Sequence, residues 1–185
     1  MTNEIPAWAR RGRGHWKHTG AERPPFAVEP GPRQESVWDY PRPPRLEEME
    51  QTVEVRHGDV VIASTDRALR IVETASAPTV YLPPDDVAME YLRRVDGTSR
   101  CEWKGEADYW SVVVGSERLD RVGWSYPDPF PPFEAVKDHL SFYPAALHCT
   151  VGGERVRPQP GGFYGGWVTD AIVGPIKGEP GSGGW

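Results

Sequence analysis

Alternation of hydrophobic and polar residues dominates the middle of the chain and predicts strands rather than helices. Val53 and Val55 alternate with polar neighbours, and the turn at His57-Gly58 leads into a second apolar run at 60–63. A period of two around a glycine turn is typical of a β-hairpin. Further strands are predicted at 68–73, 79–82, 108–114, 122–126 and 146–151, and the segment 89–95 is helix or strand, with strand favoured.

Only two short stretches follow a helical pattern. Pro84-Asp85-Asp86 predicts one helical turn, because acidic residues are favourable at a helix start. Phe133, Val136 and Leu140 follow Pro131-Pro132 with the apolar spacing of a short helix. The fold class expected is therefore mainly β: a single compact antiparallel domain, sheet-like or barrel-like, with one short helix and extended N- and C-terminal arms.

Composition divides the chain into three parts. The 185 residues include 20 glycines and 20 prolines, and prolines gather before residue 45 whereas glycines gather after residue 151. We predict a proline-rich, basic arm at 1–44, a β domain at 45–155 and a glycine- and aromatic-rich tail at 156–185. The apolar island Val37-Trp38-Asp39-Tyr40 is expected to dock on the body. The tail is a strap or mobile, and its aromatic rings favour the strap.

The net charge and the spacing of the cysteines limit the kinds of partner and cofactor that we expect. A formal net charge of −6 argues against general nucleic-acid binding, although the basic stretch 10–17 is either a phosphate-binding arm or, the favoured interpretation, a solvated tail. No apolar leader or membrane span is recognisable, which predicts a cytoplasmic protein without membrane partners. Cys101 and Cys149 form no CxxC pair, so neither a metal nor a cofactor is expected.

The densest candidate chemistry lies between residues 98 and 110, followed one hairpin later by Trp124 and Tyr126. If the two strands pair, Trp124 and Tyr126 share one face, while the neighbours Tyr109 and Trp110 point to opposite faces. The rings either stabilise the sheet or line a pocket with a few polar groups. Both interpretations remain open at this point.

The leading hypothesis is a pocket, without metal, for a small planar or heterocyclic ligand. Lys104 would meet an anionic or carbonyl group, and Gly105 would let the backbone approach the ligand. The predicted ligand-binding residues are Trp103, Lys104, Gly105, Tyr109, Trp110, Trp124 and Tyr126.

Two alternatives belong to other classes of function. An enzyme would act through Cys101, Lys104 or Glu106, although a lone cysteine is more often buried packing. An interaction module would grip a protein partner with the glycine-rich tail and the basic arm.

Five motifs in order resemble the DUF427 family, sometimes labelled nucleotidyltransferase, over about residues 42–155. They are Thr65-x-Arg67-Ala68-Leu69-Arg70, Tyr81-Leu82-Pro83-Pro84-Asp85-Asp86-Val87, Cys101-x-Trp103-Lys104-Gly105, Trp124-Ser125-Tyr126-Pro127 and Phe142-Tyr143-Pro144. The flanking segments resemble the longer, actinobacterial-type members. The chain has no Gly-Ser with paired Asp-x-Asp, so the label finds little support in the residues.

The resemblance implies a β-tent (Mss4-like) domain. The zinc of several β-tent relatives depends on CxxC pairs that this chain lacks, and it is not carried over. The cereblon-type domain of that architecture holds a cyclic ligand in a tryptophan cage, an analogy that suits Trp103, Trp110 and Trp124.

Overall fold

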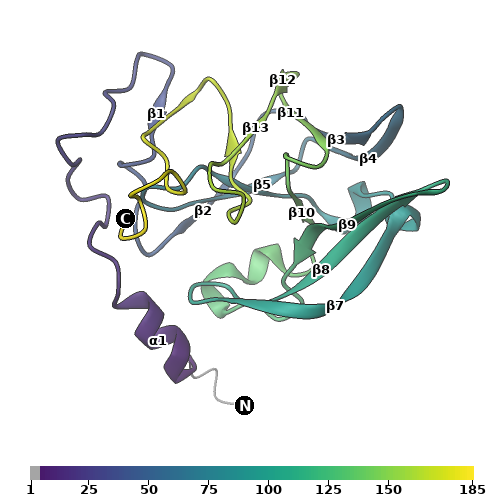
Figure 1. Cartoon of the computed structure of the whole chain (residues 1–185), viewed down its shortest axis with the longest axis horizontal. Coiled ribbons are helices and arrows are strands. Elements are labelled where there is room, and N and C mark those ends of the chain that lie inside the picture. The colour runs from purple at the N-terminus through teal and green to yellow at the C-terminus, as the bar shows by residue number, and fades with distance from the viewer. Residues whose placement is uncertain (1–4) are drawn as a thin grey trace.

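The computed structural model describes residues 5–185 and is built mainly from antiparallel sheets (Figure 1). The longest strands are β7 (Leu92–Cys101), β8 (Gly105–Val114) and β9 (Glu117–Ser125), which form two successive hairpins. The short β10 (Ser141–Phe142) extends this sheet beside β9. The expected pairing is confirmed, because Tyr109 lies directly opposite Trp124.

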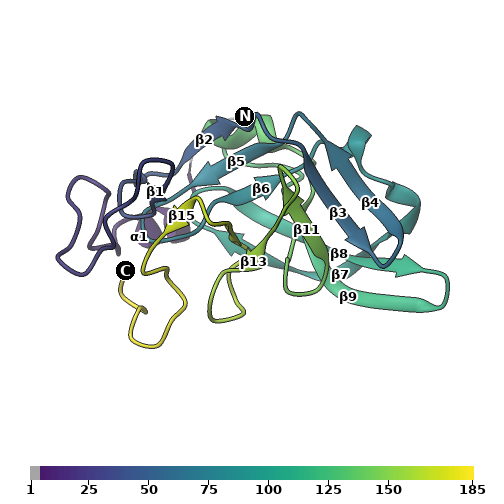
Figure 2. The same cartoon turned by 90° about the horizontal axis from the view of Figure 1, so that it is seen from above.

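A second four-stranded sheet contains the hairpin predicted at 53–63. Strands β3 (Val53–His57) and β4 (Val60–Thr65) meet at Gly58, and β11 (His148–Val151) and β12 (Glu154–Arg155) complete the order β12-β11-β3-β4. Gly58 has φ +56°, a conformation that costs glycine little. A three-stranded sheet of β2 (Arg45–Glu48), β5 (Leu69–Val72) and β6 (Thr79–Tyr81) lies alongside (Figure 2).

The two terminal segments are tied together on one side of the molecule (Figure 1). Strand β1 (Glu35–Ser36) pairs in parallel with β15 (Ile172–Val173), and β13 (Arg157–Pro158) pairs with β14 (Trp167–Val168). Val37 and Trp38 are completely buried against both segments, so the predicted docking of this island is confirmed. The tail is a strap packed on the body.

The main core lies between the two four-stranded sheets. Val53, Val55 and Ile62 from one sheet contact Val112 and Val122 from the other, which explains the period of two in the sequence. The described strands do not close into a barrel, so the sheet-like alternative is the correct one.

The helical turn predicted at Pro84–Asp86 is confirmed, whereas the helix predicted from Phe133 to Leu140 is wrong beyond Val136, because Leu140 forms a β-bridge with Leu82. Short 3₁₀ turns span Pro84–Asp86, Met89–Tyr91 and Pro131–Val136, whereas an α-helix, α1, spans Ala7–Arg13 in the arm. A seven-residue helix is not stable alone. Tertiary contacts hold it: Arg13 Nε donates to the Glu102 carbonyl at 2.8 Å, and Arg100 lies over the Trp8 ring. The solvated-tail interpretation is therefore wrong for Arg13.

Candidate functional site

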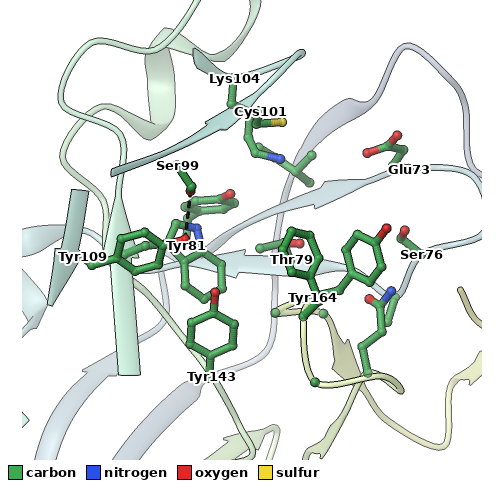
Figure 3. Close-up of a pocket in the computed structure, with 18 of the residues that line it drawn as sticks. Glu73, Ser76, Thr79, Tyr81, Ser99, Cys101, Lys104, Tyr109, Tyr143 and Tyr164 are labelled. Atoms are coloured by element: carbon green, nitrogen blue, oxygen red, sulfur yellow. Dashed lines mark hydrogen bonds between the residues drawn. The ribbon is translucent and has the colours of Figure 1, made fainter. Parts of the chain in front are cut away.

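A cavity of about 700 Å³ lies between the β7–β9 hairpins, the β5–β6 segment and the C-terminal strap. Its volume falls within the range of small-molecule sites. Figure 3 shows Tyr109 and Tyr143 at one end of it, Tyr164 and Ser76 toward the other, and Lys104 and Cys101 along one wall. Side chains from three distant parts of the sequence therefore share one hollow.

Lys104 is held in the wall by the turn between β7 and β8. Gly105 follows it with φ +105°, which lets the chain reverse, and the Lys104 carbonyl accepts a hydrogen bond from Phe130 N at 3.0 Å. The residue is only 9% exposed, yet its ammonium makes no hydrogen bond to an acceptor among residues 5–185. Lys104 therefore places a cation with hydrogen-bond donors in the cavity wall.

The charge state of Lys104 follows from two opposing effects. Burial on its own lowers the pKa of the ammonium, but the surrounding Cys101, Tyr81, Tyr126 and Glu73 raise that pKa well above its ordinary value. The side chain is consequently protonated at neutral pH. It acts as a fixed positive charge rather than as a neutral amine nucleophile.

Tyr81 supplies a second buried donor. It lies in β6 with no exposed surface, it lines the cavity, and its hydroxyl has no hydrogen-bond partner among the described residues. Burial raises the pKa of this phenol, and the positive charge of Lys104 only partly offsets the rise. The hydroxyl therefore keeps its proton at neutral pH and can donate it in a hydrogen bond.

Aromatic rings make up much of the remaining wall. Trp124 and Tyr143 pack with their ring centroids 4.6 Å apart, and the Lys104 ammonium lies 5.8 Å from the centre of the Tyr126 ring. The Tyr109 hydroxyl is already used, since it donates to Ser99 Oγ at 2.8 Å (Figure 3). The cavity thus combines flat aromatic surfaces with a mixed set of polar and charged groups, among them Arg100 and Arg121.

The acidic residues of the cavity are occupied by the protein itself. Glu73 Oε1 accepts hydrogen bonds from Arg42 Nε at 3.0 Å and from Trp103 Nε1 at 3.2 Å. Glu102 Oε1 accepts one from Trp16 Nε1 at 2.9 Å. Asp120, the third acidic residue of the lining, accepts a hydrogen bond from Ser111 Oγ at 3.0 Å.

The predicted ligand-binding residues divide into two groups. Lys104, Tyr109, Trp124 and Tyr126 line the cavity, whereas Trp103, Gly105 and Trp110 are outside its lining. Trp103 is buried with its indole on Glu73 and beneath the Arg13 guanidinium. Trp110 faces the main core, and its Nε1 donates to Ser125 Oγ at 2.9 Å. Trp103 and Trp110 therefore do not join Trp124 in a cage.

The catalytic candidates are also separated. Cys101 and Lys104 line the cavity together, but Glu106 is exposed and pairs with Arg100 at 3.1 Å on the outer side of the hairpin. None of the lining residues is a histidine. A thiol paired with an imidazole base, the usual activated cysteine arrangement, is therefore not formed by the lining.

The sequence analysis missed most of the second half of the cavity. Tyr81, Tyr143, Tyr164, Lys177 and Trp16 all line it. Two signals were available, because Tyr81 and Tyr143 belong to the motifs quoted for the family resemblance. The other three lie in the terminal segments, where no local pattern indicates a cavity.

The strap reaches the cavity at a pair of glycines that fit closely on the body. A side chain on Gly165 would overlap the six-membered ring of Trp124, and one on Gly166 would overlap Gln159 and Ala77. Trp167 then anchors the strap, since its buried Nε1 donates to the Phe142 carbonyl at 2.9 Å. The strap is therefore closely packed on the body and forms one wall of the cavity.

Replacing Gly165 with alanine is expected to lower the free energy of unfolding by about 1–3 kcal/mol, because the added methyl overpacks the Trp124 contact. Urea denaturation measures the change, and limited proteolysis tests whether the strap is released. Gly183→Ala is the matched control, since no atom lies within 4 Å of its added Cβ. Equal stability of the two variants would contradict the close fit.

Two general features of the described residues concern metals and membranes. Residues 5–185 contain no group of three or more histidine, cysteine or acidic side chains placed to hold a metal ion. In the same part of the chain, every helix is too short or too polar to cross a bilayer.

The fold and the cavity define a small β domain, closed by its own terminal segments around an aromatic, lysine-containing hollow. The chain belongs to the family described as Domain of unknown function (DUF427), whose profile matches residues 45–153. No curated protein matches the sequence. The family match covers the Lys104, Tyr81 and Trp124 side of the cavity and excludes Trp16, Tyr164 and Lys177.

Proposed function

We propose that this protein binds a small planar ligand in the cavity, with an anionic or carbonyl group of the ligand on Lys104 and Tyr81. One observation carries the proposal: Lys104 and Tyr81 both belong to the cavity lining, and the buried Tyr81 hydroxyl has no hydrogen-bond partner among residues 5–185. A ligand oxygen between them would satisfy both.

The energetic reason is the cost of burying polar groups without partners. An unsatisfied buried donor costs about 1–3 kcal/mol, and more when it is charged. Such groups are rare in native proteins, and each one calls for a specific explanation such as a ligand or an ordered water. A charge-assisted hydrogen bond to a ligand carboxylate is roughly twice as strong as a neutral one.

The shape of the ligand follows from the rings. Trp124, Tyr126 and Tyr143 offer flat surfaces beside the Lys104 ammonium. Aromatic side chains prefer offset or tilted contacts with other rings, which favours a planar or heterocyclic ligand over a branched aliphatic one.

The two alternatives gain less support. A catalyst would need a base or an activated nucleophile, but Lys104 is protonated, Glu106 lies outside the lining, and Cys101 has no histidine beside it in the lining. An interaction module would need a free tail, whereas Trp167 of the strap is buried in the body.

Tyr81→Phe provides the test, because it removes only the unpartnered hydroxyl. In a thermal-shift screen of planar aromatic acids, wild type is expected to show stabilising hits, and Tyr81→Phe to bind each hit about three- to tenfold more weakly. The free energy of unfolding without ligand should be unchanged or slightly higher, since no hydrogen bond is lost.

Tyr109→Phe is the matched control. Its hydroxyl also belongs to the cavity lining but is bonded to Ser99, so its removal should leave ligand affinity nearly unchanged. A screen without hits, or equal weakening by the two variants, would contradict the proposal.

Two finer points accompany this proposal. We propose a β-tent architecture, in keeping with a ligand cavity between sheets. We also propose a cytoplasmic location, because Cys101 and Cys149 are free thiols, as expected in a reducing compartment.

A further inference from the structure

The far end of the cavity contains a second buried lysine, in the strap. Lys177 is 4% exposed and lines the cavity. Its ammonium lies 3.5 Å from the centre of the Trp16 ring and 5.3 Å from that of Tyr164. Two rings thus hold the charged end of the side chain in place.

The Lys177 ammonium makes fewer hydrogen bonds than it can donate. Its ammonium donates to the Trp185 carbonyl at 3.1 Å, and no other hydrogen bond of this group occurs in residues 5–185. An ammonium has three donors, so the cavity faces a cation with room for a further acceptor. Cation–π contacts stabilise the charge but supply no hydrogen-bond acceptor.

This end of the cavity is built by segments outside the matched family domain. Trp16 comes from the arm, and Tyr164 and Lys177 come from the strap. Trp16 is fixed on its other side by the Arg42 guanidinium, 4.5 Å from the ring centre, and by its hydrogen bond to Glu102. The rings around Lys177, Trp16 and Tyr164, therefore come from the arm and from the strap, and their arrangement depends on both terminal segments.

We propose that the ligand is an elongated planar molecule with two anionic groups, one on Lys104 and Tyr81 and the other on Lys177. This inference rests on the proposed function and adds the substrate class: a flat dianion rather than a monoanion. The rings between the two lysines contact its planar part, and the arm and strap select for its second charge.

The charges around Lys177 agree with this role. Burial and the nearby Arg42 lower the pKa of Lys177 to about 8, although Glu73 and Glu102 act in the opposite direction. An anionic group of a ligand beside the ammonium would favour the charged form. Lys104, by contrast, stays charged well above that pH.

Isothermal titration of the full chain with matched probes tests the inference. The dianions are benzene-1,4-, naphthalene-2,6- and biphenyl-4,4′-dicarboxylate, which place two carboxylates at increasing separations. The monoanions are benzoate, 2-naphthoate and biphenyl-4-carboxylate. We expect at least one dianion to bind about tenfold or more tightly than its monoanion, as one added charge-assisted hydrogen bond would give.

Substitutions of the two lysines test which anionic group of the ligand each lysine binds. Lys177→Met should reduce dianion affinity to that of the monoanion and leave the monoanion unaffected, whereas Lys177→Arg should retain the preference. Lys104→Met should weaken both classes. Raising the pH from 7 to 9 should reduce the dianion preference, because Lys177 loses its proton near pH 8 while the carboxylates and Lys104 keep their charges.

The possible failures are distinguishable. If monoanions bind through Lys104 but no dianion is preferred at any length, or if Lys177→Met weakens both classes equally, the second anionic site is wrong and the proposed function stands. If no probe binds at millimolar concentration, or binding ignores Lys104→Met, the proposed function is wrong and the inference falls with it.

Discussion

Lys104→Met is expected to abolish ligand-induced stabilisation while leaving the unliganded protein about as stable as wild type. The methionine side chain fills nearly the same volume as the lysine stem, and Lys104 is only 9% exposed. Removing the ammonium avoids the cost of burying it but also loses its attraction to the neighbouring groups that raise its pKa, so we expect the free energy of unfolding to change by less than about 1 kcal/mol.

Ligand affinity, in contrast, should fall strongly. Losing a buried charged hydrogen bond typically costs about 2–5 kcal/mol in a complex, which corresponds to a loss in affinity of more than tenfold. Thermal melts with and without a hit from the screen measure both effects in one experiment.

Lys137→Met controls for the loss of one positive charge, because the Lys137 side chain is exposed and does not belong to the cavity lining, although its backbone forms a bridge with Tyr126. It should change neither stability nor binding. A loss of several kcal/mol in Lys104→Met without ligand would instead mean that the ammonium stabilises the fold, through Glu73 for example, and that its donors are not reserved for a ligand.

Arg42→Met is expected to have the largest effect on folding, a loss of about 3–5 kcal/mol in the free energy of unfolding. The Arg42 guanidinium is buried like the Lys104 ammonium, but each of its three nitrogens donates a hydrogen bond to the protein. Its side chain is 3% exposed, and it donates to Glu73, to the His18 carbonyl and to the Thr74 carbonyl at 2.8–3.0 Å. Removing it leaves a half-satisfied carboxylate and two unpaired carbonyls.

The same residue joins the arm to the body, because His18 belongs to the arm and Glu73 and Thr74 follow β5. Urea denaturation gives the free energy, and proteolysis of the arm reports its release. Arg45→Met is the matched control: Arg45 is exposed and, among residues 5–185, pairs only with Glu47, so a change below about 1 kcal/mol is expected. Comparable losses in both variants would contradict the distinction.

The different surroundings of Lys104 and Arg42 illustrate which features the sequence could predict and which it could not. The period of two correctly predicted the hairpins and the Tyr109–Trp124 pair, because alternation is imposed locally by the pleat. Alternation also placed Trp110 opposite Tyr109, and this is why Trp110 belongs to the core. Trp103 lies in a turn, where alternation does not apply, and its direction was not predictable.

The sequence also could not predict contacts between residues that lie far apart along the chain. Whether Lys104 has an acceptor depends on Glu73, and Glu73 is engaged by Arg42 from another segment. The strap glycines signalled flexibility, yet Gly165 serves to let the chain approach Trp124. Such close approaches are a tertiary property, and composition alone could not distinguish a mobile tail from a cavity wall.

The pairing of Glu35–Ser36 with Ile172–Val173 has a consequence for the order in which the molecule is completed. During synthesis on the ribosome, the β domain emerges long before its last partner strand does. The N-terminal segment must therefore wait for its partner strand, with Trp38 packed only against residues such as Val72 and Ala75, until the final residues leave the exit tunnel. Translation that stops short of residue 172 would release a chain that lacks β15 and the Lys177 part of the cavity wall.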